Sequence, residues 1–148
     1  MKKKSTYKGI CLFLVLSSSV HAFCFEEAAQ KYGINAHLLR AIAQTESSMR
    51  ANIESPTQDI GLMGINRSWL PILNKRFGLT EAHIWEPCIN VHVGAWILAH
   101  NFNQYGRNWN AIGAYNASCT KLKGNACTQV RNQYSRKIWD NWQKISLR

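Results

Sequence analysis

The sequence predicts a mainly α-helical single domain that contains one short, irregular β or loop region. Apolar residues recur at intervals of three and four along most of the chain, which is the period of an amphipathic helix. The length of 148 residues suits one domain with its own hydrophobic core. The composition, with 46% hydrophobic residues, 9 Gly and 3 Pro, excludes a disordered or fibrous chain. No repeat or long linker divides the sequence.

Two helices are predicted where the domain begins. Residues 25 to 32 indicate a short helix that ends at Gly33. Asn35 can cap the next helix, residues 36 to about 49, in which apolar positions keep the 3–4 spacing.

One irregular stretch separates these helices from the rest of the chain. Residues 58 to 66 combine alternation with small residues, which favours a loop or a short strand. A helix over residues 68 to 77 is expected to be interrupted near Pro71. Three further helices are predicted at residues 89 to 105, 108 to 116 and 129 to 144.

The first 22 residues have the pattern of an export signal that is removed. Four lysines between positions 2 and 8 precede an apolar run at residues 10 to 16, which is too short to span a bilayer well. Val20 and Ala22 supply the small residues that cleavage requires. We expect a signal peptide at residues 1 to 22 and a mature domain at residues 23 to 148, exported to the periplasm. The net charge then falls from +10 to +6, because 14 basic and 8 acidic residues remain.

Signal removal also leaves an even number of cysteines. Cys11 would leave with the signal, so that Cys24, Cys88, Cys119 and Cys127 remain. An even count fits two disulfides in an oxidising compartment. Four cysteines allow three pairings, and spacing alone does not choose between them. Cys119 and Cys127 flank a short polar loop that they could close locally, which would leave Cys24 to pair with Cys88.

Glu46 breaks the apolar pattern of the second predicted helix. Apolar residues precede it by seven, four and three positions, which places its carboxylate on the apolar face. A glutamate there either pairs with an arginine or lies in an apolar pocket, where desolvation raises its pKa. A carboxyl that stays protonated near neutral pH suits general acid catalysis. The alternative is a glutamate near a helix end that solvent reaches.

Five segments, in the right order, resemble the sequence blocks of the soluble-type lytic transglycosylase (SLT, family 1) domain. They are residues 44 to 49 with a Glu-Ser pair, 59 to 66 with a Gly-Leu-Met block, 88 to 98 with an Asn-containing turn before a helix, 111 to 117 with Ala-Tyr-Asn, and 134 to 138 with a late Tyr. Together they span nearly all of the mature chain. The small exported members that accompany secretion, conjugation and pilus machines are the most similar type, since they share the short length and the Pro87-Cys88 pair.

This resemblance implies a lysozyme-like fold with a groove for peptidoglycan, which is cut between N-acetylmuramic acid and N-acetylglucosamine. Glu46 would protonate the glycosidic oxygen as a general acid. As a base it would then take the proton of the muramyl C6 hydroxyl, whose attack on C1 leaves a 1,6-anhydro end. The cut would open the wall locally for an envelope-spanning secretion, conjugation or pilus machine.

The resemblance also carries over a set of substrate-binding residues. The Tyr115 hydroxyl could hold the Glu46 carboxyl, Asn116 could bond sugar or backbone, and Ser47 would contact substrate or support the site. The full set is Ser47, Gly61, Met63, Gly64, Tyr115, Asn116 and Tyr134. Four tryptophans could stack on sugar faces, although most tryptophans in so small a domain belong to the core: Trp69, Trp85, Trp109 and Trp139.

Two positions depart from the family pattern. Gly64 stands where the family usually has Gln, so a hydrogen bond to the glycan is lost or replaced by water. Asp59 precedes the Gly-Leu-Met block, where most members lack an acid and animal lysozymes carry their second carboxylate. Asp59 is expected to stabilise the transition state electrostatically or to permit hydrolysis, unless it only forms a turn. The alternatives are thus a lysozyme-type muramidase that uses Glu46 and Asp59, and a non-catalytic subunit that binds peptidoglycan.

Other function classes find no support in the sequence. The chain has no Cys-x-x-Cys pair and no His-Glu-x-x-His helix, so no metal site is predicted, and no cofactor is expected. The positive charge is not accompanied by a recognisable nucleic-acid-binding motif. We expect a monomer whose partners are peptidoglycan strands and components of the envelope machine.

Overall fold

The computed structural model describes residues 23 to 147, so the predicted signal peptide lies outside the described residues. Within them the chain forms seven α-helices, one 3-10 helix (η1) and two short strands. In chain order these are α1 (Phe25–Tyr32), α2 (Ala36–Ser47), β1 (Asp59–Ile60), β2 (Ile65–Asn66), η1 (Arg67–Trp69), α3 (Leu70–Phe77), α4 (Glu81–Ile84), α5 (Pro87–Tyr105), α6 (Trp109–Asn116) and α7 (Gly124–Ser146).

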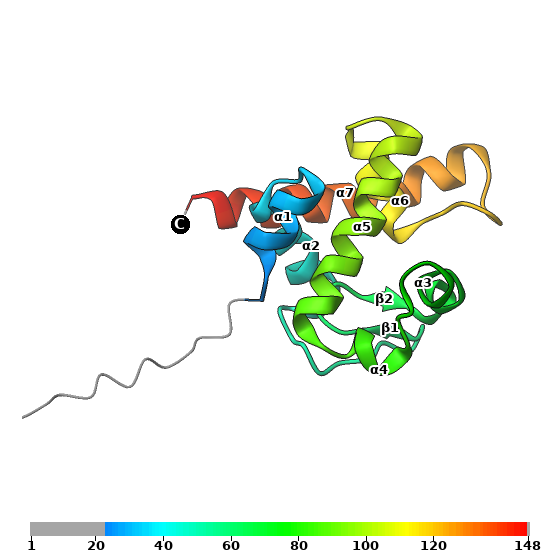
Figure 1. Ribbon diagram of the computed structural model, residues 1–148. Helices are drawn as coiled ribbons and strands as arrows, with labels where there is room; N and C mark the ends of the chain where they lie inside the picture. The colour runs from blue at the N-terminus through cyan, green and yellow to red at the C-terminus, as the bar shows by residue number, and fades with distance from the viewer. Residues whose placement is uncertain (1–22, 148) are drawn as a thin grey trace, which may run out of the picture.

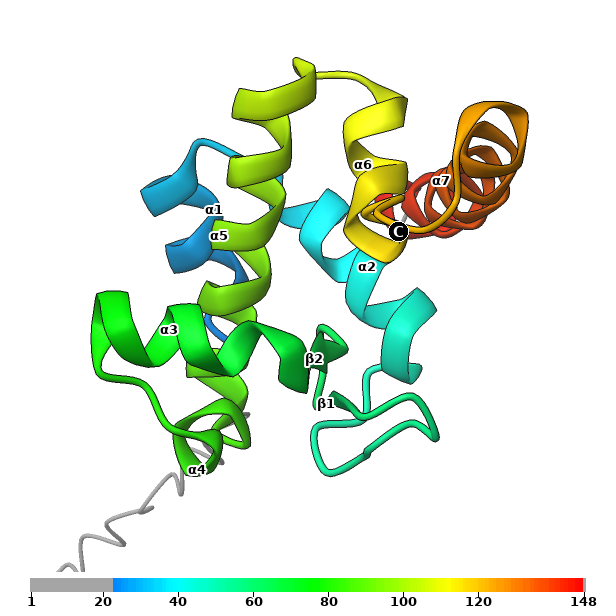
Figure 2. The ribbon, with the colours of Figure 1, turned by 90° about the vertical axis from the view of Figure 1, so that its right-hand side faces the viewer.

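The helix α5 is the central element of the domain (Figures 1 and 2). It contacts α1, α2, α4 and α6, and α7 packs against α2 and α6. The strands, α3 and α4 gather around the N-terminal end of α5, below α7 in the view of Figure 1. Apolar residues cover most of the circumference of α5, as expected of a helix with neighbours on several sides.

Local signals place several helix ends where the sequence predicts them. Gly33 ends α1 in a left-handed conformation with φ of 62°. The Asn35 side chain caps α2 by accepting hydrogen bonds from two backbone N–H groups, and Asn108 caps α6 in the same way with one. The region of residues 58 to 66 is an antiparallel hairpin in which Asp59 pairs with Asn66.

Three expectations about the helices need correction. Pro71 does not interrupt a helix, because it lies in the first turn of α3, where its missing N–H is not needed. The short helix α4 was not predicted, since four residues are too few for a periodic signal. The last helix begins at Gly124 rather than at 129, because its first turn carries little of the apolar pattern by which the start was predicted.

Two disulfides join the four cysteines of the mature chain. Cys24 pairs with Cys88, which links the segment before α1 to the first turn of α5. Cys119 pairs with Cys127 and closes the loop before α7 onto its second turn. The local pairing that spacing allowed is therefore confirmed, together with the long-range pair that it leaves.

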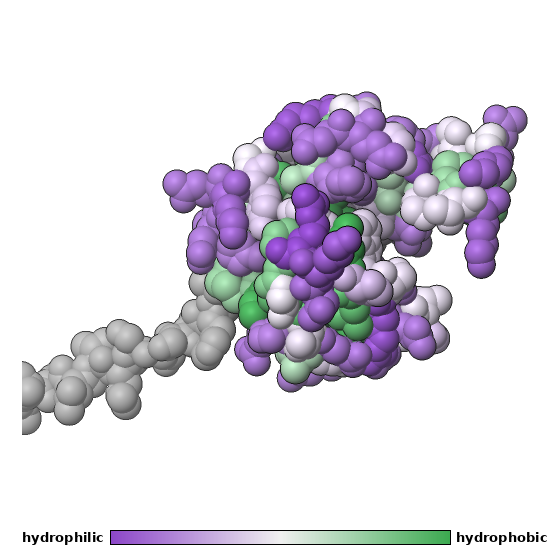
Figure 3. All heavy atoms as spheres, turned by 45° about the vertical axis from the view of Figure 1, so that its right-hand side comes forward, coloured by the Kyte–Doolittle hydropathy of each residue, from purple (hydrophilic) through white to green (hydrophobic). Residues whose placement is uncertain are grey.

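The surface is largely polar on the side that Figure 3 shows, with hydrophobic residues gathered near the middle of that side. The described helices include none that is both long and apolar enough to cross a membrane.

Candidate active site

A groove of about 420 Å³ lies where the end of α2, the hairpin and the end of α6 meet. Five of the predicted site residues line it: Glu46, Asp59, Gly64, Tyr115 and Asn116. All five chain segments that carry the family-like blocks therefore line this groove or hold it in place.

The Glu46 carboxyl is protonated up to neutral pH by its surroundings. Burial raises its pKa from 4.5 to about 7, and the negative charge of Asp59 adds to the increase. A hydrogen bond from the Tyr134 hydroxyl and the charge of Lys137 act in the opposite direction. This confirms the apolar setting that the spacing of Glu46 predicts, and it leaves the carboxyl able to give and to take a proton near pH 7.

The phenol that holds Glu46 is Tyr134, which corrects the expectation for Tyr115. The Tyr134 hydroxyl donates to Glu46 Oε1, whereas the Tyr115 hydroxyl donates to the Met63 carbonyl oxygen at 2.8 Å. The two rings stack with their centroids 6.5 Å apart, and burial raises the pKa of both hydroxyls well above the usual value. Tyr115 therefore lines the groove and holds the hairpin, while Tyr134 fixes the carboxyl.

The Asp59 carboxyl is oriented by three donors, two from the segment just before β1 and one from β2. Ser55 Oγ donates to it at 2.6 Å, Asn66 Nδ2 at 2.8 Å, and the Thr57 hydroxyl also donates. The cross-strand pairing of Asp59 with Asn66 produces the second of these contacts. Asp59 thus faces the same groove as Glu46 with a fixed orientation.

Three predicted substrate-binding residues support the groove from behind and do not line it. Ser47, Gly61 and Met63 are buried, which excludes direct contact with a substrate in this conformation. The Ser47 hydroxyl donates to the Leu62 carbonyl oxygen at 2.9 Å and so ties the end of α2 to the hairpin turn. Ser47, Gly61 and Met63 therefore contribute to the packing of this turn.

Asn90 is a supporting residue that sequence reasoning did not single out. Its side chain accepts from the Met63 N–H at 2.7 Å and donates to the carbonyl oxygens of Ile60 and Ile84, both at 2.9 Å. A Cβ at Gly61 would lie 2.5 Å from its Nδ2. Asn90 is almost fully buried in α5. A polar Asn among the apolar residues of a predicted helix is the sequence signal that could have identified this role.

The structure gives a physical reason for glycine at position 64. Gly64 has a φ of +58°, and a Cβ there would lie 2.7 Å from Glu46 Oε2. A larger residue in this backbone conformation would displace the carboxyl. Glycine in place of the family's Gln therefore leaves room for the Glu46 carboxyl in its observed position.

Most of the other residues that line the groove were not predicted from the sequence. Trp69 alone of the four tryptophans considered for sugar stacking lines it. The others in the lining are one apolar residue of α5, Ile97, and five small or polar residues with no distinctive sequence signal: Thr57, Asn66, Ser68, Ala114 and Ser118.

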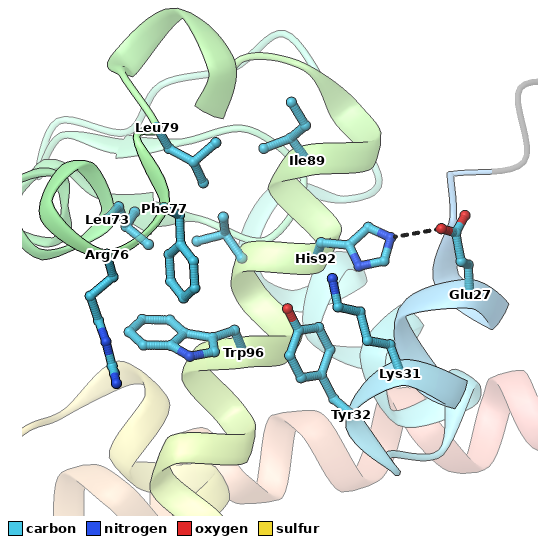
Figure 4. Close-up of a pocket in the computed structure, with 11 residues that line it drawn as sticks. Glu27, Lys31, Tyr32, Leu73, Arg76, Phe77, Leu79, Ile89, His92 and Trp96 are labelled. Carbon is cyan, nitrogen blue, oxygen red and sulfur yellow. Dashed lines mark ion pairs between the residues drawn. The ribbon is translucent and has the colours of Figure 1, made fainter.

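A larger cavity, of about 720 Å³, lies between α1, α3 and α5 and contains none of the predicted site residues (Figure 4). Its walls are mainly apolar, with Phe77 and Leu79 facing Ile89 of α5. The cavity is also lined by Glu27, Lys31, Arg76 and His92. The two carboxyls predicted to act together, Glu46 and Asp59, lie in the smaller groove.

A family model described as "Transglycosylase SLT domain" matches residues 23 to 141. Invasion protein IagB of Salmonella typhimurium is 36% identical over 141 residues, which are 92% of this chain and 85% of that protein. Protein IpgF of Shigella flexneri is 31% identical over 91% of each chain. X polypeptide of Escherichia coli is 37% identical over 78% of this chain and 70% of its own length.

A solved structure shows the same fold. An inactive mutant of the lytic transglycosylase Slt from Pseudomonas aeruginosa superposes with a TM-score of 0.69 at 19% identity. The match covers 86% of this chain but only 24% of that protein, so this chain spans about a quarter of its length. The predicted fold class, a mainly helical lysozyme-like domain with a small irregular β region, is confirmed.

Proposed function

Because this chain belongs to the transglycosylase SLT domain family, we propose that it is a peptidoglycan lytic transglycosylase. It cleaves the β-1,4 bond between N-acetylmuramic acid and N-acetylglucosamine and leaves a 1,6-anhydro end. The observation that carries the proposal is the Glu46 carboxyl, which lies beside the groove with a pKa of about 7.

One carboxyl can perform both steps of this reaction. Protonated Glu46 donates its proton to the glycosidic oxygen, and the bond from that oxygen to C1 of the muramyl residue breaks. The resulting Glu46 carboxylate takes the proton of the muramyl C6 hydroxyl, and the C6 oxygen bonds to C1. No water is consumed, and Glu46 regains its proton. The Tyr134 hydroxyl steadies the carboxylate between the steps, and Asp59 opposes the positive charge that develops on the sugar ring.

Asp59 supports a second candidate activity, which is hydrolysis in the manner of a lysozyme. Asp59 lies in the groove with Glu46, and most glycoside hydrolases use a pair of carboxyl groups for catalysis. In that reaction water attacks C1 and the product keeps a reducing end. A non-catalytic role was suggested by Gly64 alone, and the close approach of Gly64 to Glu46 supplies another reason for that glycine.

Export completes the proposal. Residues 1 to 22 act as a cleaved signal, and the mature chain works on the wall in the periplasm, where its two disulfides can form. There it opens the wall locally for an envelope-spanning machine. The similarity to an invasion protein is consistent with such a role.

Product analysis tests the activity. The mature chain is incubated with purified peptidoglycan, and the released muropeptides are weighed beside those from Glu46→Gln. We expect anhydro products from the parent and none from the variant. Products heavier by one water would assign the hydrolase instead. Absence of any product from the parent, with wall binding intact in both proteins, would assign the non-catalytic role.

A further inference from the structure

A third cavity, of about 540 Å³, lies along α7 and is lined by two exposed tryptophans; we call it the α7 cavity. Trp109 begins α6, Trp139 lies in α7, and about two fifths of each side chain is exposed. Asn132, Arg136 and Asp140 flank them at four-residue steps, which places the three on one face of α7.

This cavity is separate from the catalytic groove. Tyr134 contacts Glu46, and Arg136 follows Tyr134 by two residues, so their side chains leave α7 about 200° apart around the helix axis. The two cavities share no lining residue. The helix α6 contributes to both, with Trp109 at its first residue and Asn116 at its last.

The indole rings are held in place before any ligand arrives. The rings of Trp109 and Trp139 meet edge to face with centroids 5.3 Å apart, and Trp142 packs against both. The Ser135 hydroxyl donates to the Trp109 carbonyl oxygen at 2.7 Å, which fastens the start of α6 to α7. A preorganised aromatic surface binds with a small loss of conformational entropy.

The polar residues have hydrogen-bonding capacity left for a ligand. Neither Arg136 nor Asp140 forms an ion pair with another residue in the described part of the chain. An apolar indole face suits the C–H face of a pyranose ring, while Asn132 and Asp140 suit its hydroxyl and acetamido groups. Arg136 suits the carboxylates that peptidoglycan carries on its stem peptides.

The α7 cavity shares residue types with the groove, which also combines a tryptophan with asparagine and aspartate side chains. The cavity between α1, α3 and α5 holds charged side chains too, but two of them, Glu27 and His92, form an ion pair with each other (Figure 4). In the α7 cavity the charged side chains of Arg136 and Asp140 form no ion pair within the described part of the chain. Both are therefore available to a saccharide that carries hydroxyl and carboxylate groups.

We propose that this cavity is a second, non-catalytic binding site for a glycan strand of peptidoglycan. It holds one strand of the insoluble wall while the groove cuts another. The inference rests on the proposed function for the identity of the polymer.

Co-sedimentation with purified, insoluble peptidoglycan tests the site, with Glu46→Gln as the background so that the wall is not cut during the measurement. Adding Trp139→Ala should raise the protein concentration for half-saturation about tenfold, equivalent to about 1.4 kcal/mol. Arg136→Gln changes an exposed residue and should raise it by a smaller factor, so the test survives if Trp139→Ala does not fold. Phe77→Ala removes an aromatic side chain that is 49% exposed in the largest cavity and should change nothing.

Activity provides an independent readout in the chain that retains Glu46. Trp139→Ala and Arg136→Gln should slow product release from the insoluble wall and leave cleavage of short soluble fragments unchanged. Unchanged wall binding in both variants, or an equal loss in Phe77→Ala, would overturn the proposal and leave the tryptophans as a surface for a protein partner. Normal binding by the parent that depends on Trp139, without any product, would instead contradict the proposed activity while this site stands.

Discussion

At the scale of single residues, the proton affinity of Glu46 is a balance of opposing contributions. Burial and Asp59 favour the neutral acid, whereas Tyr134 and Lys137 favour the carboxylate. Because the balance lies near pH 7, neither form is far in free energy from the other at neutral pH. The proposed reaction, in which one acid becomes a base within a turnover, needs this property.

Replacing Glu46 should stabilise the protein at alkaline pH. The pKa of Glu46 is about 7 in the folded chain and near 4.5 when unfolded, so the folded state holds a proton that the unfolded state has lost between these values. The free energy of unfolding should therefore fall as pH rises from about 4.5 to 7 and stay lower above it. In Glu46→Gln this fall should be absent, with a gain of up to about 3 kcal/mol at pH 8. Urea unfolding at several pH values measures it, and parallel curves for the two proteins would contradict it.

Removing the Tyr134 hydroxyl should shift the pH dependence of activity. In Tyr134→Phe the carboxylate loses a hydrogen bond that lowers its pKa, so the pKa of Glu46 should rise. We expect the pH profile of peptidoglycan cleavage to move to higher pH and the maximal rate to fall by about tenfold or more. Tyr105→Phe is the control, because Tyr105 contacts Arg131 and not Glu46. An unshifted profile would show that Tyr134 does not set the proton affinity.

Restoring the family's usual residue at position 64 should lower activity. Gly64→Gln requires a left-handed backbone at a non-glycine residue, which costs about 1 kcal/mol, and its Cβ would meet Glu46 Oε2 at 2.7 Å. The carboxyl must then move away from Tyr134. Gly78→Gln provides a control, since Gly78 is also left-handed but a Cβ there meets nothing within 4 Å. Cleavage rates of the two variants, compared with their unfolding free energies, separate the contact from the backbone strain. Equal loss of activity in both would argue against a role for the contact.

At the scale of elements, the turn between β1 and β2 is positioned by three helices. Ser47 at the end of α2, Asn90 in α5 and Tyr115 in α6 each hydrogen-bond to its backbone between Ile60 and Met63. These bonds satisfy backbone groups of the four-residue turn (residues 61 to 64) and its flanks that pairing of two such short strands leaves unpaired. The geometry of Gly64 and Asp59 around the groove therefore depends on the packing of helices that lie behind it.

Removing the Asn90 amide should weaken the fold and the site together. Asn90→Ala leaves the Met63 N–H and the Ile60 and Ile84 carbonyl oxygens without their buried partner, for an expected loss of about 2 to 4 kcal/mol. Cleavage should fall even where the variant remains folded, because the turn beside Glu46 is released. Asn103→Ala, at an exposed position of the same helix, should change neither the melting temperature nor the rate. A folded Asn90→Ala chain with full activity would contradict this account.

At the scale of the whole molecule, local signals predicted most helix ends, whereas the long-range hydrogen bonds of the site were not predicted, although the long-range disulfide was. Asn35 and Gly33 mark helix ends through their own backbone neighbours, and the apolar face of α2 placed Glu46 in its setting. The partner of Glu46 is 88 residues away in the sequence, and the spacing of apolar residues contains no information on which of two tyrosines reaches it. Asn90 was overlooked for the same reason, because two of its three partners, Ile60 and Met63, are about 30 residues away in the sequence.

The two disulfides should contribute unequally to the stability of the whole domain. Cys24 and Cys88 are 64 residues apart and Cys119 and Cys127 only 8, so the first bond restricts the unfolded chain more. Loop-closure entropy predicts losses of about 4 kcal/mol when Cys24 and Cys88 are both replaced by Ser, and about 2.5 kcal/mol for the other pair. The first bond also fastens the start of α1 to α5, the helix around which the domain is built, so its loss should loosen α1 as well. Thermal unfolding of the two double variants measures the difference, and hydrogen exchange in α1 locates it. A larger loss from the Cys119 and Cys127 pair would mean that the loop before α7 stabilises the folded state directly, beyond its effect on the unfolded chain.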